Sequence, residues 1–446
     1  MDQYPDTSRR ITDAAATSTG DRLDAYVDRY ATRTHGMTAS EVRSLFSVAS
    51  RPEVVSLAGG MPNISGLPMD VVGSLLTELV DKRGLTAMQY GSGQGDALLR
   101  EQICEIMQTA GIHGHPDDVT VTVGSQQALD LVTRIFIDPG DVILAEAPSY
   151  VGALSTFRSY QADVVHIEMD DDGLVPDRLR EAIQSVTDSG RRIKFLYTIP
   201  NYHNPAGVTL PPERRTEILE ICQQADVLII EDDPYGLLGF DTDCPRALRA
   251  DDDERVIYLG SFSKTFAPGF RVGWTLAPHA VREKLVLAAE SSVLCPPAFS
   301  QMAVSQYLVG HDWRGQVKAF REMYRERRDA MLEALDDLMP EGTHWTRPTG
   351  GFYVWLTLPS GLDAKAMLPR AVTNRVAYVP GTAFYADGFG SRSMRLSYCY
   401  PTPERIREGI RRLAQVVEQE MELRAAFGAS ATSQRPGLDA PAPNQS

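Results

Sequence analysis

Residues 260–274, which read GSFSKTFAPGFRVGW, place a lysine among groups that can act together on a small molecule. Lys264 follows an apolar run, and hydroxyl and guanidinium groups flank it at Ser261, Ser263 and Arg271. An amine held near apolar side chains has a lowered pKa and can form a Schiff base with a carbonyl. Two hydroxyls and a guanidinium are suited to bind a phosphate. The same pattern is also typical of a solvated surface loop, so the chemistry needs support from other parts of the chain.

An aldehyde that must meet an amine, on a molecule that also carries a phosphate, describes pyridoxal phosphate. A second anion site is indicated at residues 124–127, where Gly-Ser-Gln-Gln follows the run VTVTV and opens a helical pattern. The first backbone amides of a helix and its positive dipole end attract anions. Ser125 and the neighbouring amides are therefore candidates for the same phosphate, although Ser125 as a simple N-cap fits the sequence equally well.

Two acids, Glu231 and Asp232, end the apolar run VLII, and Asp233 and Tyr235 follow. A carboxylate at a buried strand end has a raised pKa unless it meets a positive partner. A protonated pyridine nitrogen is such a partner, and the resulting ion pair keeps the ring electron-poor. The alternative is that these acids cap the following turn.

Three further polar or aromatic side chains can complete a site for a pyridine ring. Asn204 in PNYHNPAG and Tyr235 can donate hydrogen bonds to a phenolate oxygen, and Tyr150 in AEAPSY can stack on the ring face. Either tyrosine can instead belong to the core, and Asn-Pro by itself is a common turn.

The elements that must position these residues alternate between apolar runs and helical patterns from residue 118 onward. The runs are VTVTVG, VILAEAP, VVHIEM, IKFLYTIP, VLIIEDD and VIYLGSF, with helices expected from Ser125, Tyr150, Asp177 and Pro211. Apolar strands between amphipathic helices indicate a parallel sheet covered on both faces. Ligands of such folds bind beyond the carboxyl ends of the strands, where each candidate between residues 124 and 264 is expected.

The rest of the chain is expected to fall into recognisable segments. Residues 1–36 are interpreted as a polar arm with one helical patch near residues 23–30, and residues 37–49 as an amphipathic helix. The expected segments are an arm at 1–36, a substrate-site segment at 37–80, a large domain at 81–312, a linking helix at 313–339, a small domain at 340–423 and a disordered tail at 424–446.

Bulk composition limits the function classes. With 446 residues, 43% of them hydrophobic, the chain can bury a large core, and a formal net charge of −15 argues against nucleic acid and anionic membranes as partners. The five cysteines have no CxxC spacing, so neither a disulfide framework nor a metal site is signalled. No secretory or membrane-spanning run is present in the sequence, and we expect a cytoplasmic protein.

Five motifs in this order resemble the fold-type I pyridoxal phosphate aminotransferases of class I/II: TVGSQQALDL, PNYHNPAG, EDDPYG, GSFSKTFAPGFRVGW and MRLSY. ASEVRSLF, SLAGGMPN and MQYG, which precede the sheet, are most similar to the 2-aminoadipate and kynurenine/aromatic aminotransferases. The resemblance covers about residues 37–422. It implies an α/β fold whose large domain has a mainly parallel, seven-stranded sheet between helices, with a smaller α+β C-terminal domain.

The resemblance also implies a role for each matching residue. Lys264 is expected to be the Schiff-base lysine and the group that moves the substrate proton. The expected cofactor contacts are Asp232 at the pyridine nitrogen, Asn204 and Tyr235 at the phenolic oxygen, Tyr150 at the ring face, and Ser125, Gln126, Ser261, Ser263, Arg271 and Tyr90 at the phosphate. Tyr90 is expected to reach the phosphate from the other subunit of a homodimer. Arg395 is expected to bind the α-carboxylate of the substrate together with Asn204.

Substrate specificity is less well defined by the sequence. Arg43 matches an arginine that binds a distal carboxylate in some relatives, and Gly60 a glycine that lets the substrate approach; Arg43 as a solvated helix residue is an equal alternative. His203 stands where the family usually has glutamine, and GSGQG replaces a proline-bearing turn after Tyr90. We expect an acidic donor such as 2-aminoadipate, or an aromatic or kynurenine-like one, with 2-oxoglutarate as the acceptor.

Two other functions stay open at this stage. One is a different pyridoxal phosphate reaction, such as elimination, cyclisation or oxidation, on the same anchor residues. The other is a non-enzymatic effector sensor of the kind that carries an N-terminal DNA-binding domain, for which the residues before the match are too few and the chain too acidic.

Overall fold

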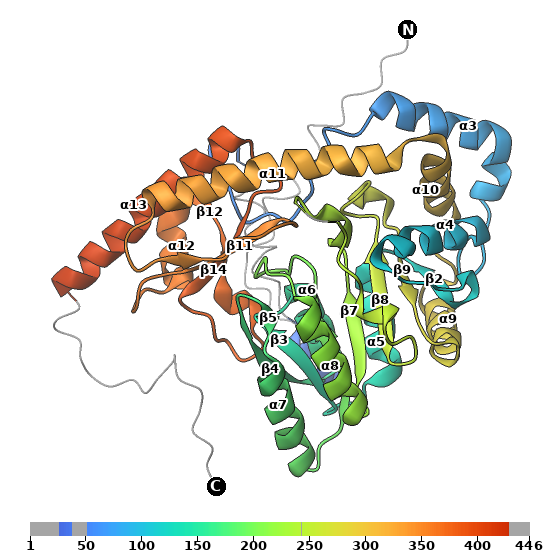
Figure 1. The fold of residues 1–446 in the computed structure, drawn as a ribbon, viewed down its shortest axis with the longest axis horizontal. Coiled ribbons are helices and arrows are strands. Elements are labelled where there is room, and N and C mark those ends of the chain that lie inside the picture. The colour runs from blue at the N-terminus through green and yellow to red at the C-terminus, as the bar shows by residue number, and fades with distance from the viewer. Residues whose placement is uncertain (1–25, 38–50, 242, 428–446) are drawn as a thin grey trace.

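The computed structural model describes residues 26–37, 51–241 and 243–427 (Figure 1). Arg43, most of the helix expected at 37–49 and residues 428–446 of the expected tail lie outside this part. Near the N-terminus the structure has two short 3₁₀ turns, η1 (Val27–Arg29) and η2 (Thr32–Gly36). The expected helical patch is therefore replaced by 3₁₀ turns within the described residues.

An eight-stranded sheet forms the centre of the molecule, in the order β2-β9-β8-β7-β6-β3-β4-β5. Its strands are β2 (Val119–Thr122), β3 (Val142–Ala147), β4 (Asp163–Asp170), β5 (Gly173–Leu174), β6 (Ile193–Thr198), β7 (Leu228–Asp232), β8 (Val256–Ser261) and β9 (Gly273–Leu276). β3 pairs in parallel with β4 and β6, and the parallel pairing continues through β7 to β8. The mainly parallel sheet is confirmed.

Two strands differ from the expected pattern. β9 runs antiparallel to both β8 and β2 because the chain turns back after the lysine segment and pairs with the strand that it has just left. β5 is a two-residue strand antiparallel to β4, which brings the expected seven strands to eight. Neither strand has the long apolar run by which the other strands were identified.

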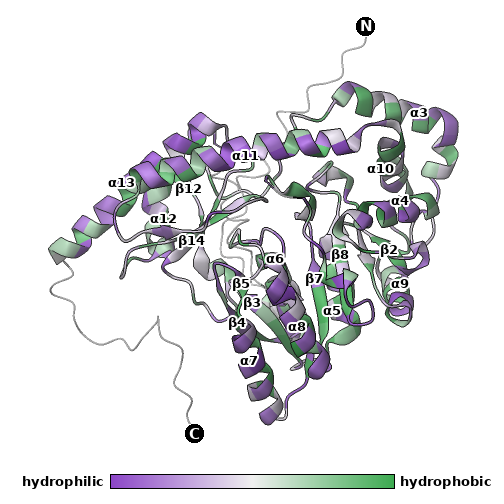
Figure 2. Ribbon diagram, viewed as in Figure 1, coloured by the Kyte–Doolittle hydropathy of each residue, from purple (hydrophilic) through white to green (hydrophobic). Residues whose placement is uncertain are grey.

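Helices cover both faces of this sheet. They are α5 (Ser125–Phe136), α6 (Val151–Ser159), α7 (Pro176–Asp188), α8 (Pro212–Gln224) and α9 (His279–Val293). Ile143, Ile230 and Ile257 pack with α5, α6 and α9, whereas their neighbours Leu144 and Ile229 pack with α7 and α8. Successive strand residues point to opposite faces, so both faces are apolar and the strands read as continuous apolar runs. Figure 2 shows this concentration of apolar residues on the strands.

A second group of elements lies at the C-terminal end of the chain. It contains α12 (Ala364–Thr373), α13 (Pro403–Phe427) and the antiparallel sheet β10-β11-β14-β13, formed by β10 (His344–Trp345), β11 (Tyr353–Thr357), β14 (Ser393–Ser397) and β13 (Val379–Pro380). β1 (Val55–Ser56) pairs in parallel with β12 (Val376–Ala377). The N-terminal segment therefore joins this group.

The long helix α11 (Trp313–Leu338) connects the two groups and lies along α13 (Figure 1). α3 (Met69–Ala87), α4 (Ala97–Met107) and α10 (Ala298–Gly310) pack together beside the large sheet. How these elements divide into domains stays a prediction. Two expected boundaries fall inside helices, because α3 continues past residue 80 and α13 continues past residue 424 to Phe427.

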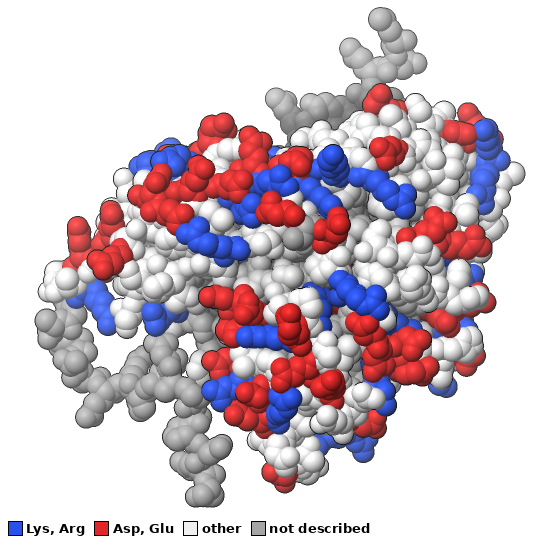
Figure 3. Space-filling view, in the orientation of Figure 1, with Lys and Arg blue, Asp and Glu red and all other residues white. Residues whose placement is uncertain are grey.

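Acidic and basic side chains are interspersed on the face shown in Figure 3. Arg407 of α13 and Asp337 of α11, for example, pair at 2.8 Å. None of the helices in the described part of the chain combines the length and the apolar character that crossing a bilayer requires.

The pairing of β8 with β9 gives a test of packing at the sheet centre. Gly260 lies opposite Trp274, and a β-carbon at Gly260 would overlap the indole ring. We expect Gly260→Ala to lower the free energy of unfolding by about 1–3 kcal/mol through overpacking. Gly73→Ala is the control: Gly73 lies in α3 with nothing within 4 Å of an added β-carbon, so that alanine is expected to stabilise by about 0.5–1 kcal/mol. Thermal unfolding measures both, and equal melting temperatures for the two variants would contradict the packing argument.

Candidate active site

The predicted residues collect around one cavity of about 410 Å³ between the large sheet and the C-terminal elements. The residues that line it are Gly60, Met61, Ser125, Gln126, Tyr150, Val151, Gly152, Ser155, Ile199, Asn204, Asp232, Pro234, Tyr235, Ser261, Ser263, Lys264, Pro268, Arg271, Tyr353 and Arg395. Most of the predicted ones follow the carboxyl ends of β2, β3, β6, β7 and β8. The expectation that ligand-binding residues lie beyond these strand ends agrees with the geometry.

One end of the cavity is an anion cradle. α5 begins at Ser125, which lines the cavity together with Arg271, so the free backbone amides at the start of the helix and the guanidinium belong to the same part of the cavity. Arg271 has a left-handed backbone (φ 55°) and its Nη1 donates to Ser263 Oγ at 3.3 Å. The hydroxyl of Ser261 accepts from the backbone N–H of Ser263 at 3.0 Å, which fixes the turn that carries both serines. Cationic and N–H groups converge here, as a phosphate requires.

Two glycines allow this cradle to form. A β-carbon at Gly124 would overlap the guanidinium of Arg271, and one at Gly273 would stand 2.6 Å from the backbone of Gly124 and Ser125. Gly124 also has a positive φ of 73°, which L-residues rarely adopt. The space for an anion therefore depends on the absence of side chains at these positions.

Asp232 lies at the floor of the cavity with one carboxylate oxygen in use and one free. Its Oδ2 accepts from the hydroxyl of Tyr197 at 2.8 Å, whereas its buried Oδ1 has no hydrogen-bond partner in the protein. Burial raises the pKa of Asp232 to about 7. A buried, unpartnered acceptor is costly unless a donor meets it, so this oxygen is placed for a cationic N–H group.

The neighbouring acids point elsewhere. Glu231 accepts from the backbone amides of Leu248 and Arg249 at 3.0 and 2.9 Å, on the other side of the sheet. Asp233 accepts from Tyr258 Oη at 3.1 Å and from the amide of Gly236 at 2.8 Å. Asp232 is therefore the acid of this run that faces the cavity.

The amine of Lys264 lies between Asp232 and the C-terminal elements. Its Nζ donates to the carbonyl of Gly60 at 3.1 Å and stands 5.5 Å from the ring centre of Phe352. Burial lowers the pKa of Lys264 to about 8. About half of the amine is therefore deprotonated at pH 8, which a lysine nucleophile or base needs.

Arg395 of β14 lies opposite the sheet and is buried. Its Nη1 donates to Asn204 Oδ1 at 2.9 Å and its Nη2 to the carbonyl of Ala58 at 2.9 Å. The guanidinium stacks over the ring of Tyr353 at 4.2 Å. A carboxylate that entered the cavity would meet a guanidinium already fixed in position.

The side chains of Tyr150 and Gln126 are joined by a hydrogen bond. Tyr150 Oη donates to Gln126 Oε1 at 3.3 Å, and Gln126 Nε2 donates to Thr156 Oγ1 at 2.9 Å. The side chain of Gln126 therefore holds Tyr150, and its backbone amide is the part that lies at the start of α5. The expected contact of Gln126 with the phosphate stays a prediction.

Two residues of the site were not found by sequence reasoning. Tyr197 binds Asp232, and Tyr353 lines the cavity, where its hydroxyl accepts from Tyr235 Oη at 3.4 Å. A β-carbon on Gly60 would overlap this same hydroxyl, so glycine there gives Tyr353 its room. Both tyrosines lie within apolar strands, where an aromatic residue reads as core.

One predicted residue of the described chain does not line the cavity. Tyr90 does not line it, and 79% of its surface is exposed. Arg43 lies outside the described residues. The contact of Tyr90 was expected with the phosphate of the other subunit and stays a prediction.

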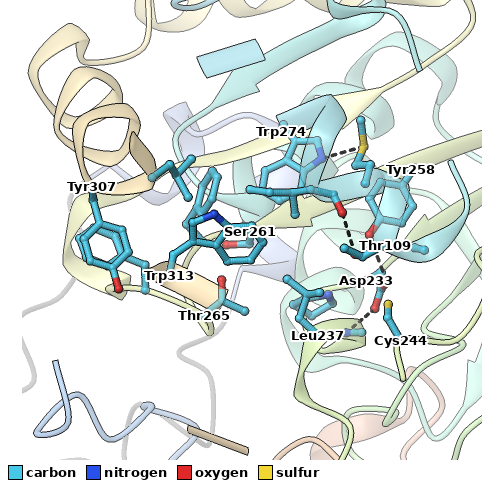
Figure 4. A pocket seen from close by; sticks show the side chains of 18 residues that line it. Thr109, Asp233, Leu237, Cys244, Tyr258, Ser261, Thr265, Trp274, Tyr307 and Trp313 are labelled. Atoms are coloured by element: carbon cyan, nitrogen blue, oxygen red, sulfur yellow. Dashed lines mark hydrogen bonds between the residues drawn. The ribbon is translucent and has the colours of Figure 1, made fainter. Parts of the chain in front are cut away.

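A second cavity, shown in Figure 4, shares Ser261 and Pro234 with the first. Its volume is about 30 Å³, and its walls are mainly apolar, with Trp274 Nε1 donating to Met107 Sδ at 3.3 Å on one side. This space holds about one water molecule. Of these two cavities, the one of about 410 Å³ has room for an amino acid.

The residues of the larger cavity fit pyridoxal phosphate. The cradle at α5 and Arg271 suits its phosphate, the unpartnered Oδ1 of Asp232 suits its pyridine N–H, and the amine of Lys264 suits its aldehyde. These groups meet in one cavity although 139 positions separate Ser125 from Lys264 (264 minus 125).

Comparison with known proteins agrees with this chemistry. Residues 62–413 match the family model for aminotransferase class I and II. The chain is 44% identical over 400 residues to aromatic-amino-acid aminotransferase 1 of Thermococcus litoralis, which covers 89% of this chain and 96% of that protein.

Solved structures are similar as well. The kynurenine aminotransferase of Pyrococcus horikoshii, in complex with PMP, superposes with a TM-score of 0.85 at 40% identity and covers 89% of this chain and 99% of its own. LysN, the α-aminoadipate aminotransferase of Thermus thermophilus, has a TM-score of 0.83 at 34% identity and covers 90% and 100%. The chain therefore belongs to the class I and II aminotransferases, and its cofactor is pyridoxal 5′-phosphate.

Proposed function

We infer that this aminotransferase moves the amino group of an acidic amino acid such as 2-aminoadipate, or of an aromatic or kynurenine-like one, to 2-oxoglutarate. The observation that carries the inference is the single cavity in which Lys264 and Asp232 face Arg395. The relatives that act on aromatic amino acids, kynurenine and α-aminoadipate support the donor classes.

Arg395 is the residue that binds the α-carboxylate in this account. Asn204 and Ala58 hold two of its nitrogens, and its buried Nε has no partner in the protein. The guanidinium is therefore preorganised, and a carboxylate that binds it loses little in ordering the side chain. Such a contact orients the α-carbon toward Lys264.

Pyridoxal phosphate supplies a carbonyl that takes up the amino group and a ring that withdraws electrons from the α-carbon. Asp232 holds the ring nitrogen in its protonated state, because a buried carboxylate is stabilised by a cation beside it. Nζ of Lys264 accepts the α-proton and passes it on, which its pKa of about 8 favours near neutral pH.

The walls of the cavity suit the aromatic donor class, and the contact with the distal carboxylate of an acidic donor is assigned to Arg43 in this proposal. Tyr353, Tyr150 and Ile199 offer aromatic and apolar contact to a ring, while Arg395 offers a charged contact to the α-carboxylate that every donor carries. One cavity can accept chemically different side chains when its walls are apolar and its polar anchors bind only the shared α-carboxylate. Broad specificity among amino donors agrees with this arrangement.

The active unit in this proposal is a homodimer with shared sites. Leu85, Met88, Tyr90 and Leu294 are large apolar or aromatic side chains with more than half of their surface exposed. The segment after Met88 lies against α9 and α10, since Gly93 approaches Glu290 and Gly91 approaches Ala298. A second copy of the chain that covered this surface would bury these side chains and could bring Tyr90 to the phosphate of the other subunit.

The donor is tested with a panel of amino acids added to the holoenzyme. Acidic or aromatic donors are expected to bleach the visible absorption band of the cofactor, and 2-oxoglutarate is expected to restore it with formation of glutamate. Lys264→Ala is expected to lose the reaction, because no amine remains at the α-carbon to move the proton. A band that no amino acid bleaches, with turnover to an elimination or oxidation product instead, would replace transamination by another pyridoxal phosphate reaction.

The lowered pKa of Lys264 predicts how pH affects uptake of the cofactor. Only the deprotonated amine attacks an aldehyde, so the rate at which cofactor-free protein gains the visible band should rise with pH and level off above about 8. The negative charge of Asp232 raises the pKa of Lys264, so Asp232→Asn is expected to move this midpoint to lower pH. Stopped-flow absorbance measures both profiles, and a midpoint near that of a free lysine would contradict the account.

Hybrid dimers test whether Tyr90 acts across subunits. Lys264→Ala and Tyr90→Ala homodimers each carry the same defect in both sites. If Tyr90 serves the neighbouring subunit, a hybrid of the two variants contains one site with both residues intact and should regain cofactor affinity and turnover at that site. If Tyr90 serves its own subunit, every site of the hybrid stays defective. Equilibrium titration with pyridoxal phosphate distinguishes the two results, and sedimentation verifies that the hybrid is a dimer.

A further inference from the structure

A buried pair of ionisable residues lies next to the active site but does not line its cavity. Glu146 ends β3 and His203 follows β6, and each has only 1% of its surface exposed. Nε2 of His203 stands 3.0 Å from Oε2 of Glu146. Burying two ionisable groups costs free energy unless other polar groups of the protein contact them. We therefore ask which parts of the structure this pair holds in place.

Glu146 ties together the ends of two neighbouring strands. Its Oε1 accepts from Thr198 Oγ1 at 2.7 Å, and its Oε2 accepts from the backbone amide of Ile199 at 2.8 Å. Both partners belong to the end of β6 and the residue after it. The carboxylate is therefore fixed relative to the sheet before His203 meets it.

His203 in turn closes the segment that follows β6. Its backbone N–H donates to the carbonyl of Val208 at 2.8 Å, and its own carbonyl accepts from Gly207 at 2.6 Å. Its Nδ1 accepts from the N–H of Ala206 at 3.2 Å. Because Nδ1 accepts, the ring proton is assigned to Nε2, which faces Oε2 of Glu146 at 3.0 Å without the alignment of a regular hydrogen bond. One side chain thus joins the 203–208 turn to the end of β3.

The turn carries Asn204, whose Oδ1 accepts from Nη1 of Arg395 at 2.9 Å. We propose that the close contact between His203 and Glu146 sets the position of Asn204, and through it the guanidinium of Arg395, for the substrate carboxylate. His203 and Glu146 are positioning residues in this account, since neither lines the cavity. The inference rests on the proposed role of Arg395.

A merely structural role would have a different signature. Loss of a buried hydrogen bond that only stabilises the fold lowers the melting temperature and leaves the affinity for a carboxylate unchanged. Loss of a positioning contact weakens carboxylate binding even where the protein stays folded. Glutarate and 3-phenylpropionate serve as probes, because each carries a carboxylate but no amine, and calorimetry measures their dissociation constants on the holoenzyme without turnover.

Two replacements of His203 separate its two ring nitrogens. In His203→Asn, the side chain can still accept from Ala206 but is too short to reach Glu146, and we expect the dissociation constants to rise about tenfold or more. In His203→Gln, an amide N–H can still reach Glu146, and binding is expected to stay close to wild type. KM for the amino donor should follow the same order, with a smaller change in kcat.

The partner residue and a matched control complete the test. Glu146→Gln presents an amide N–H to donors and should weaken binding like His203→Asn, with no further loss in the double variant because both changes break one contact. Thr198→Val removes another partner of the same carboxylate with little change of shape. It is expected to lower the melting temperature while leaving the dissociation constants unchanged.

Arg395→Lys in the same titration separates this inference from the function on which it rests. If Arg395→Lys leaves carboxylate binding intact, the proposed carboxylate site is wrong. If Arg395→Lys weakens binding but His203→Asn does not, the positioning role of the pair is wrong and the carboxylate site stands. The same conclusion follows if Thr198→Val weakens binding as much as His203→Asn does.

Discussion

A buried lysine amine whose pKa lies well below that of a free lysine is the constraint on which the rest of this structure depends. Burial lowers the pKa of Lys264 to about 8, while the same loss of water raises the pKa of Asp232 to about 7. The pKa of each group therefore lies near neutral pH because the group is buried, and not because of a strong direct bond between the two groups. The carbonyl of Gly60, the N-terminal segment and β14 complete the enclosure, so the chemistry depends on two sheets meeting at one place.

Close approach of backbone to side chain shapes the cavity as much as charge does. Gly124, Gly273 and Gly60 stand where a β-carbon would overlap Arg271, the start of α5 or Tyr353. Each glycine therefore gives room to a neighbour that lines the cavity. At Glu146 and His203, by contrast, polar side chains are buried next to each other. Such burial is costly, and in our proposal it holds the 203–208 turn in place.

The aminotransferase family, the cofactor and the mainly parallel sheet could be predicted from the chain alone, because strand runs and ordered motifs are local signals. Sequence reasoning missed β9, Tyr353 and Tyr197. β9 is short and its partner strand is fixed only by the return of the chain, while the two tyrosines look like core residues until the sheets come together. The domain boundaries and the roles of the site residues remain predictions.

The sequence by itself determined the residue types and their order: an amine after an apolar strand, serines and an arginine beside it, acids at one strand end and an arginine in MRLSY. Tertiary structure decided which of these groups face one another. The alternation of side chains along β7 sends Asp232 into the cavity and Glu231 to the opposite face, and the tertiary fold brings Arg395 of β14 to Asn204, which follows β6. Distances between groups far apart in sequence follow from packing, which no local pattern specifies.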